Sequence, residues 1–280
     1  TQPVFLRSDF TLTRFPVVLP AERNMQVDLL ANTNQSLFLT NTTNLSQQIL
    51  ASMEQVSGVP FYELGSVPLY FVPEDINGYA GLNTSDRGIL TTVGPGTSVL
   101  AQAQLLAHEY AHLQNASASR LKERWLQEGY SEWVSARYLY QNFPTKAVYR
   151  FLKYFRVDDF FEENSQGLDR FPLQSWGTSP SRLGYAKTMM FFDLLTEEVG
   201  SVALQKALQL GVNYELTAEK FQSFLEVESG KSLDSDFQYW VFAGDPASGY
   251  DPRVIFIDID GDGLLTTHEQ SIGSDPTKAD

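Results

Sequence analysis

The sequence of 280 residues contains no cysteine, which excludes disulfide bonds, thiolate metal sites and cysteine nucleophiles. It also lacks an apolar run of the roughly 18 residues needed to cross a bilayer, so we expect no membrane insertion. Basic residues are scarce, since 20 lysines and arginines stand against 34 acidic residues, a net charge of −14. Such a chain repels the phosphates of nucleic acid, which we therefore exclude as a partner.

Apolar residues are abundant: 42% of the chain is hydrophobic and 13% is aromatic, enough for a large core in one or two domains. Short runs of β-branched and aromatic residues predict strands at 67–74 and 88–94. The Asn/Ser/Thr-rich tract 31–48 is typical of loops, with a helix expected over 45–57. Apolar periodicity predicts helices at 120–141, 146–156, 182–199, 201–210, 217–228 and 233–242.

This order of elements predicts an α+β protein. We expect a strand-rich part with a sheet above a cleft over residues 1–95 and a mainly helical part over 96–250. A short separate tail follows over 251–280, because the composition changes there to seven acidic and two basic residues.

The stretch "LLAHEYAHLQN", residues 105–115, holds two of the three histidines of the chain. A Gly-Pro-Gly break precedes it, and Thr97 or Ser98 can then cap a helix. On that helix His108 and His112 are four residues apart, so both imidazoles project from one face and can reach one Zn²⁺. Glu109 can polarise the water of such a site. The alternative is a pair of surface histidines. It is weak, because an HExxH motif rarely arises by chance in a chain that has only three histidines.

A catalytic zinc needs a third protein ligand. His268 is far along the chain, so we expect a carboxylate instead. The segment "RWLQEGYSEW" supplies Glu128, separated from His112 by fifteen residues, on a predicted helix. Glu132 lies one turn further on the same face, where it can hydrogen-bond the far nitrogen of a ligand histidine. The alternative for both glutamates is a solvated helix face.

The combination of "HEYAH" and "WLQEGYSEW" resembles the gluzincin metallopeptidases, especially their aminopeptidase-N-like branch. The segment "GYAKTMMFFDLL" is similar to the Tyr-x-Lys-Gly segment of that branch, and "SGKSLDSDFQYWVFAGDPASGYD" to the segment that closes its helical part. The resemblance covers roughly residues 98–250. It implies a zincin-like metallopeptidase fold, with the gluzincin catalytic part at 96–250.

The resemblance also implies residue roles. His108, His112 and Glu128 would bind zinc, and Glu109 would act as general base and then as general acid. Tyr185 would donate a hydrogen bond to the oxyanion, although a core aromatic at a helix start is the alternative for it. The expected activity is zinc-dependent hydrolysis of peptide bonds in a peptide or protein substrate.

The sequence departs from the branch in two ways, of which the first implies a tighter connection between the two helices and the second concerns the substrate. The interval from His112 to Glu128 is shorter than is usual in the branch. The strand before the metal helix, "GILTTVGPG", also lacks the Gly-x-Met-Glu-Asn glutamate that binds a free amino terminus. Residues Gly88–Val93 are expected to pair with an extended peptide as an edge strand. The missing glutamate slightly favours an endopeptidase over an aminopeptidase.

Two other readings stay open. One is a non-catalytic, calcium-dependent surface or adhesion module on a peptidase fold. The other is a zinc enzyme that acts on a non-peptide bond. The oligomeric state is not readable from the sequence.

The segment "DIDGDGLLTTHE", residues 258–269, fits a twelve-residue EF-hand-like calcium loop, with Gly263 at the sharp turn. Its expected calcium ligands are Asp258, Asp260, Asp262, Leu264 through its carbonyl, Thr266 and Glu269. The alternative is an ordinary Asp/Gly turn. Such loops usually work at roughly millimolar calcium, so we expect a secreted or cell-surface protein.

Overall fold

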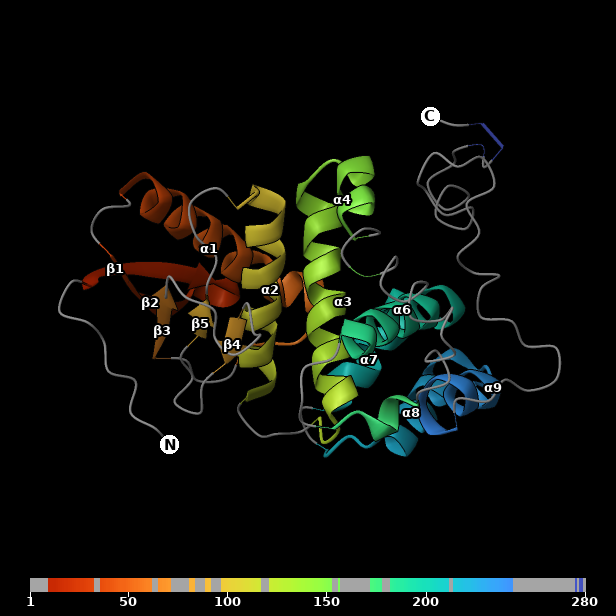
Figure 1. The fold of residues 1–280 in the computed structure, drawn as a ribbon. Coiled ribbons are helices and arrows are strands. Elements are labelled where there is room, and N and C mark those ends of the chain that lie inside the picture. The colour runs from red at the N-terminus through yellow and green to blue at the C-terminus, as the bar shows by residue number, and fades with distance from the viewer. Residues whose placement is uncertain are drawn as a thin grey trace.

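The computed structural model describes residues 10–32, 36–61, 65–71, 81–83, 89–91, 97–116, 121–152, 156, 172–177, 182–211, 214–243, 275, 277 and 278. A small sheet with helix α1 forms one side of the molecule, and helices α6 to α9 form the other (Figure 1). Helices α2 and α3 stand between these two parts (Figure 1). The site that concerns function is built on these two central helices.

The sheet has five strands in the order β1-β2-β3-β5-β4. A long hairpin pairs β1, Phe10–Leu19, with β2, Arg23–Asn32, in antiparallel register. Strand β3, Ser66–Phe71, runs parallel to β2 and to β5, Ile89–Thr91. The short β4, Gly81–Asn83, pairs antiparallel with β5 and forms one edge. The expectation that Gly88–Val93 forms an edge strand is therefore wrong, because β5 has a partner strand on both sides.

Helix α1, Ser36–Ser57, begins well inside the polar tract that predicted a loop. Its buried residues explain the difference: Leu45, Ile49, Met53 and Val56 recur at helical spacing and belong to the main hydrophobic core. Asn, Ser and Thr occupy much of the rest of the helix. Burial of this apolar stripe outweighs the modest helix propensity of those residues.

The metal helix α2 spans Val99–Ala116, and α3 spans Arg124–Asn142. The later helices follow the sequence-based expectation closely, and they are α4 at Thr145–Leu152, α6 at Arg182–Val199, α7 at Ser201–Leu210, α8 at Ala218–Ser229 and α9 at Asp234–Phe237. A 3-10 turn at Leu173–Ser175 and a π-helical turn at Gln238–Phe242 complete this part. No helix in the described part of the chain is both long and apolar enough to cross a membrane.

Helices α3 and α6 pack closely at Gly129. A Cβ built at this glycine would lie 2.5 Å from Phe192 Cε2 and closer still to Thr188 Oγ1. Thr188 Oγ1 also donates a 2.8 Å hydrogen bond to the backbone carbonyl of Trp125. The glycine after Glu128 therefore brings α6, which carries Tyr185, against α3. The result is a helix-rich protein with a small sheet, while the expected calcium-binding tail lies outside the described residues apart from three isolated positions.

Candidate zinc centre

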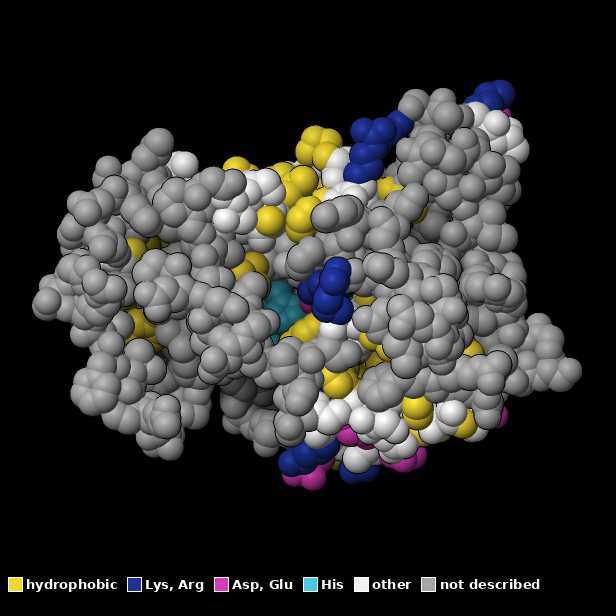
Figure 2. Space-filling view, viewed as in Figure 1, with side chains coloured by type: hydrophobic (Ala, Val, Ile, Leu, Met, Phe, Trp, Pro, Cys, Tyr) yellow, Lys and Arg dark blue, Asp and Glu magenta, His cyan; other side chains and the backbone are white. Residues whose placement is uncertain are grey.

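Helix α2 presents the HExxH residues from its middle turns. Ser98 caps the helix, since its Oγ accepts a 3.2 Å hydrogen bond from the backbone N–H of Ala101. His108 and Glu109 are buried, and His112 is partly exposed. Histidine side chains are visible in a hollow near the centre of the face in Figure 2. Of the two rings, that of His112 is the more accessible from outside.

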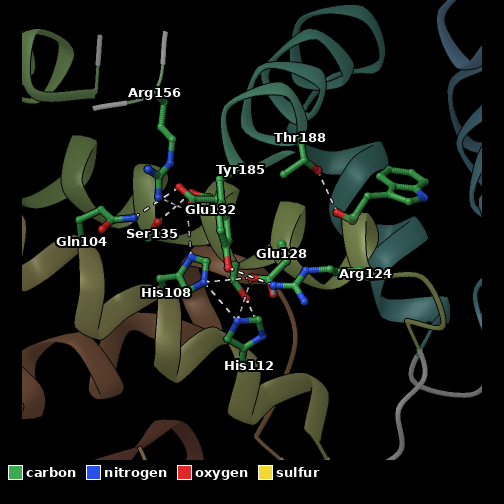
Figure 3. A network of polar contacts seen from close by, with 12 residues as sticks. Gln104, His108, His112, Arg124, Glu128, Glu132, Ser135, Arg156, Tyr185 and Thr188 are labelled. Carbon is green, nitrogen blue, oxygen red and sulfur yellow. Dashed lines mark hydrogen bonds and ion pairs between the residues drawn. The ribbon is translucent and has the colours of Figure 1, made fainter. Parts of the chain in front are cut away.

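Helix α3 brings Glu128 against both histidines (Figure 3). Its Oε2 lies 3.2 Å from His108 Nε2 and 3.3 Å from His112 Nε2. The two Nε2 atoms lie 3.2 Å from each other. One oxygen and two nitrogens thus form a nearly equilateral triangle with one atom from each side chain.

This triangle has the size of one face of a zinc tetrahedron. Ligand atoms around a tetrahedral ion are about 1.63 bond lengths apart, so bonds of about 2.0–2.1 Å place them about 3.3–3.4 Å apart. The separations in the structure are 3.2 and 3.3 Å. The donor set, two imidazoles and one carboxylate with a fourth position left for water, is that of a catalytic zinc. His108, His112 and Glu128 therefore fit a zinc ion.

The far nitrogens of both histidines also face polar groups on α3. Glu132 Oε1 lies 3.2 Å from His108 Nδ1, and Ser131 Oγ lies 3.2 Å from His112 Nδ1. Gln104 Nε2 in turn donates a 3.4 Å hydrogen bond to Glu132 Oε2. Partners at Nδ1 hold the rings so that Nε2 faces the centre of the triangle.

Two arginines accompany the two glutamates of α3. Arg124 Nη2 lies 3.6 Å from Glu128 Oε1, one helical turn away. Arg156 Nη2 donates a 2.6 Å hydrogen bond to Glu132 Oε1. Sequence analysis did not identify either arginine, or Ser131. Arg124 and Ser131 lie one turn from Glu128 on α3, which is a usable signal, whereas Arg156 reaches the site from a distant part of the chain.

The charges of the site favour a bound cation. Burial lowers the pKa of His108, but contacts with Glu128 and Glu132 outweigh it and raise the pKa to about 10. Burial raises the pKa of Glu109, while His108 and His112 lower it by a smaller amount. Within the described residues, Glu109 Oε2 is buried and has no hydrogen-bond partner. Three carboxylates around two imidazoles thus attract a positive charge, either protons or a metal ion.

Tyr185 enters the site from the first turns of α6. Its ring centroid lies 6.1 Å from that of His108, and its hydroxyl accepts a 3.3 Å hydrogen bond from Arg124 Nη2. Figure 3 shows the hydroxyl directed towards Arg124 and Glu128, beside the two histidines. Burial raises the pKa of Tyr185, so the phenol keeps its proton at neutral pH. A neutral phenol is a hydrogen-bond donor as well as an acceptor.

The structure thus brings together His108, Glu109, His112, Glu128, Glu132 and Tyr185, all of which the sequence singled out. The six expected calcium ligands lie outside the described residues and stay predictions. They are Asp258, Asp260, Asp262, Leu264, Thr266 and Glu269.

Comparison with known proteins shows which solved structures share this fold. No family model matches the chain, and no curated protein matches its sequence. Aminopeptidase A of Legionella pneumophila, solved with aspartic acid, superposes with a TM-score of 0.64 at 15% identity, over 84% of this chain and 28% of that one. The M1 zinc metallopeptidase of Deinococcus radiodurans gives a TM-score of 0.59 at 15% identity, over 84% of this chain and 52% of that one.

A variant of the Deinococcus radiodurans enzyme, solved with a Tyr-Ser-Ala substrate, gives a TM-score of 0.60 at 15% identity, over 84% of this chain and 53% of that one. The chain therefore spans between about a quarter and a half of the length of these neighbours. It shares the fold of solved M1 zinc metallopeptidases and carries, on its two central helices, a His-His-Glu cluster that fits a zinc site.

Proposed function

We propose that this protein is a zinc-dependent peptidase whose metal is held by His108, His112 and Glu128. One observation carries the proposal: the three ligand atoms are mutually 3.2–3.3 Å apart, as around a tetrahedral zinc. The shared fold of M1 zinc metallopeptidases supports it. A bound zinc supplies an acidified water and a Lewis acid for the peptide carbonyl.

The side chains of this chain then divide the remaining work. Glu109 takes the proton of the attacking water and later delivers it to the leaving amine. Its buried carboxylate has a free oxygen within the described residues and sits beside the ligand histidines, as that role requires. Tyr185 donates its O–H to the carbonyl oxygen as negative charge develops there. Glu132 and Ser131 hold the histidine rings through Nδ1.

We propose an endopeptidase rather than an aminopeptidase. An aminopeptidase needs an acidic group that binds the free amino terminus of the substrate. The edge strand β4 has the sequence Gly-Leu-Asn, and β5 reads Ile-Leu-Thr, so neither strand carries a carboxylate. The Legionella and Deinococcus neighbours, by contrast, are described as an aminopeptidase and as M1 metallopeptidases that bind single amino acids or a tripeptide.

The test combines metal analysis with peptide cleavage. The purified protein should contain about one zinc per chain, and a peptide library should be cleaved internally whether its amino termini are free or acetylated. If only peptides with free amino termini are cleaved, the proposed endopeptidase activity is wrong and the protein is an aminopeptidase. Bound zinc without any cleavage would instead support the non-catalytic surface module. The complete set of site residues argues against that module.

We also propose that residues 258–269 bind calcium and that the protein is secreted or displayed at the cell surface. The support is the loop sequence itself, whose Asp258, Asp260, Asp262 and Glu269 stand at ligand positions. A loop of this kind is filled at extracellular calcium concentrations. The calcium would have a structural role.

A further inference from the structure

The side chain of Tyr185 is enclosed by three groups in addition to the histidines. Its ring meets the Trp176 ring edge-to-face, with centroids 5.0 Å apart. The guanidinium carbon of Arg156 lies 5.3 Å from the tyrosine ring centroid. Arg124 Nη2 lies 3.3 Å from the hydroxyl oxygen. The ring is thus held by packing, whereas the hydroxyl is held by Arg124.

The contact with Arg124 determines where the hydroxyl proton of Tyr185 can point. A guanidinium has five N–H donors and no acceptor, so the tyrosine oxygen must accept in this hydrogen bond. The O–H of a phenol lies near the ring plane and has two orientations. Because Arg124 occupies one of them, the hydrogen is directed to the other side of the oxygen. There it is available to an acceptor other than Arg124, next to His108.

Arg124 is itself held in place. It lies 3.6 Å from Glu128 Oε1, whose other oxygen faces both histidines. Its guanidinium carbon also lies 5.1 Å from the Trp176 ring centroid. Since the side chain is only 19% exposed, water competes weakly for its donors. Arg124 therefore joins a candidate metal ligand and the tyrosine through one rigid group.

We propose that Arg124 is a positioning residue for Tyr185. By donating to the tyrosine oxygen, it orients the O–H towards the carbonyl oxygen of the substrate and strengthens the phenol as a donor. Arg124 does not touch the reacting atoms; it acts through Tyr185. The proposal rests on the proposed peptidase function and adds a residue to its oxyanion-binding group.

The test is a double-mutant cycle on the zinc-loaded protein with Arg124→Gln, Tyr185→Phe and the double variant. Loss of one oxyanion donor typically lowers kcat by about 100- to 1,000-fold, which is the expectation for Tyr185→Phe. For Arg124→Gln we expect a fall in kcat of about 10- to 100-fold with KM nearly unchanged, because a misplaced group costs up to about 100-fold. The double variant should be no slower than Tyr185→Phe alone.

A binding measurement provides a readout besides turnover. A peptide phosphonate presents a tetrahedral anion like that of the reaction, so its affinity should fall in Arg124→Gln and in Tyr185→Phe. Again the double variant should lose nothing further. Arg124→Lys, which keeps a cationic donor, should recover part of the kcat lost in Arg124→Gln.

The matched control is Arg137→Gln on the same helix. Arg137 also stacks on a tryptophan, with its guanidinium carbon 5.0 Å from the Trp133 ring centroid, but it does not contact Tyr185. Its loss should leave kcat and zinc content unchanged.

The outcomes separate the two proposals. A wild-type protein that holds zinc but cleaves no peptide overturns the peptidase assignment. A wild-type protein that cleaves, with losses from Arg124→Gln and Tyr185→Phe that multiply in the double variant, overturns the role of Arg124 alone. So does loss of zinc from Arg124→Gln, since the arginine would then act through Glu128.

Discussion

Glu132 on α3 lies against His108 on α2, with Oε1 3.2 Å from Nδ1, while Nε2 of the same ring faces Glu128. One imidazole is thus held between two carboxylates that are one helical turn apart. This arrangement needs both helices, because α2 supplies the ring and α3 supplies both of its partners. The orientation of the His108 ring is thereby fixed, with Nδ1 facing Glu132 and Nε2 facing Glu128.

Replacing Glu132 by Gln should weaken zinc binding. The change removes the charge that faces His108 Nδ1, and loss of such a partner typically costs about 10- to 100-fold in metal affinity. Competition with a fluorescent chelator measures the effect. The control is Glu228→Gln, which removes a carboxylate of α8 that pairs with Lys206 of α7, and this variant should bind zinc as the wild type does. Equal zinc affinity in both variants would contradict a role of Glu132 in zinc binding.

Replacing Glu109 by Gln should separate metal binding from turnover. The amide cannot accept the proton of water, and general base catalysis typically contributes about 100- to 10,000-fold. Zinc content by atomic absorption should stay at the wild-type level, because Glu109 is not among the three ligands. A variant that cleaves peptides at an unchanged rate would contradict the assigned role.

Replacing Gly129 by Ala should destabilise the protein through the contact of α3 with α6. The new methyl group meets Phe192 and Thr188, and overpacking of this kind typically costs about 1–3 kcal/mol of unfolding free energy. Denaturant unfolding measures the difference. Among the described residues, no atom lies within 4 Å of a Cβ built at Gly65, so Gly65→Ala should change stability by less than about 0.5 kcal/mol.

The metal-free protein should lose stability as the pH rises from about 6.5 towards 10. The folded-state pKa of His108 is raised from 6.5 to about 10 by Glu128 and Glu132. A raised pKa stabilises the folded state fully below pH 6.5, and this contribution declines as the proton is lost on the alkaline side. Thermal unfolding between pH 6.5 and 9 measures it.

The zinc-loaded protein is the control for this pH dependence. A ligand imidazole is neutral, so the alkaline decline assigned to His108 should be absent when zinc is bound. The same slope in both forms would mean that His108 is not its source.

Removing calcium should lower the melting temperature without removing zinc. If residues 258–269 form the expected loop, a chelator selective for calcium over zinc shifts the equilibrium towards the unfolded state. Calorimetry at millimolar calcium and after chelation measures the shift. Asp258→Asn/Asp260→Asn should show a low melting temperature in both conditions. An identical melting temperature for the wild type with and without calcium would contradict the loop.

Much of the fold followed from local sequence patterns. The helices after residue 120 and the capped metal helix were predicted because apolar periodicity and caps are local signals. The first half of helix α1, before residue 45, and the edge of the sheet were not. The start of α1 depends on apolar residues that are buried only against the core of the whole protein. The two neighbours of β5 depend on the order of the strands in the sheet, which no local pattern encodes.

The sequence by itself determined the chemistry that this protein can offer: two histidines on one helix face, a glutamate between them, and Glu128 and Tyr185 on later helices. The tertiary structure alone decided their distances and their partners. Arg124 and Ser131 lie on the same helix as Glu128, but only packing brings them against Tyr185 of α6 and His112 of α2, and Arg156 comes from outside these helices. Spacing along one helix fixes a face, but only packing between helices brings three ligand atoms within 3.3 Å of one another.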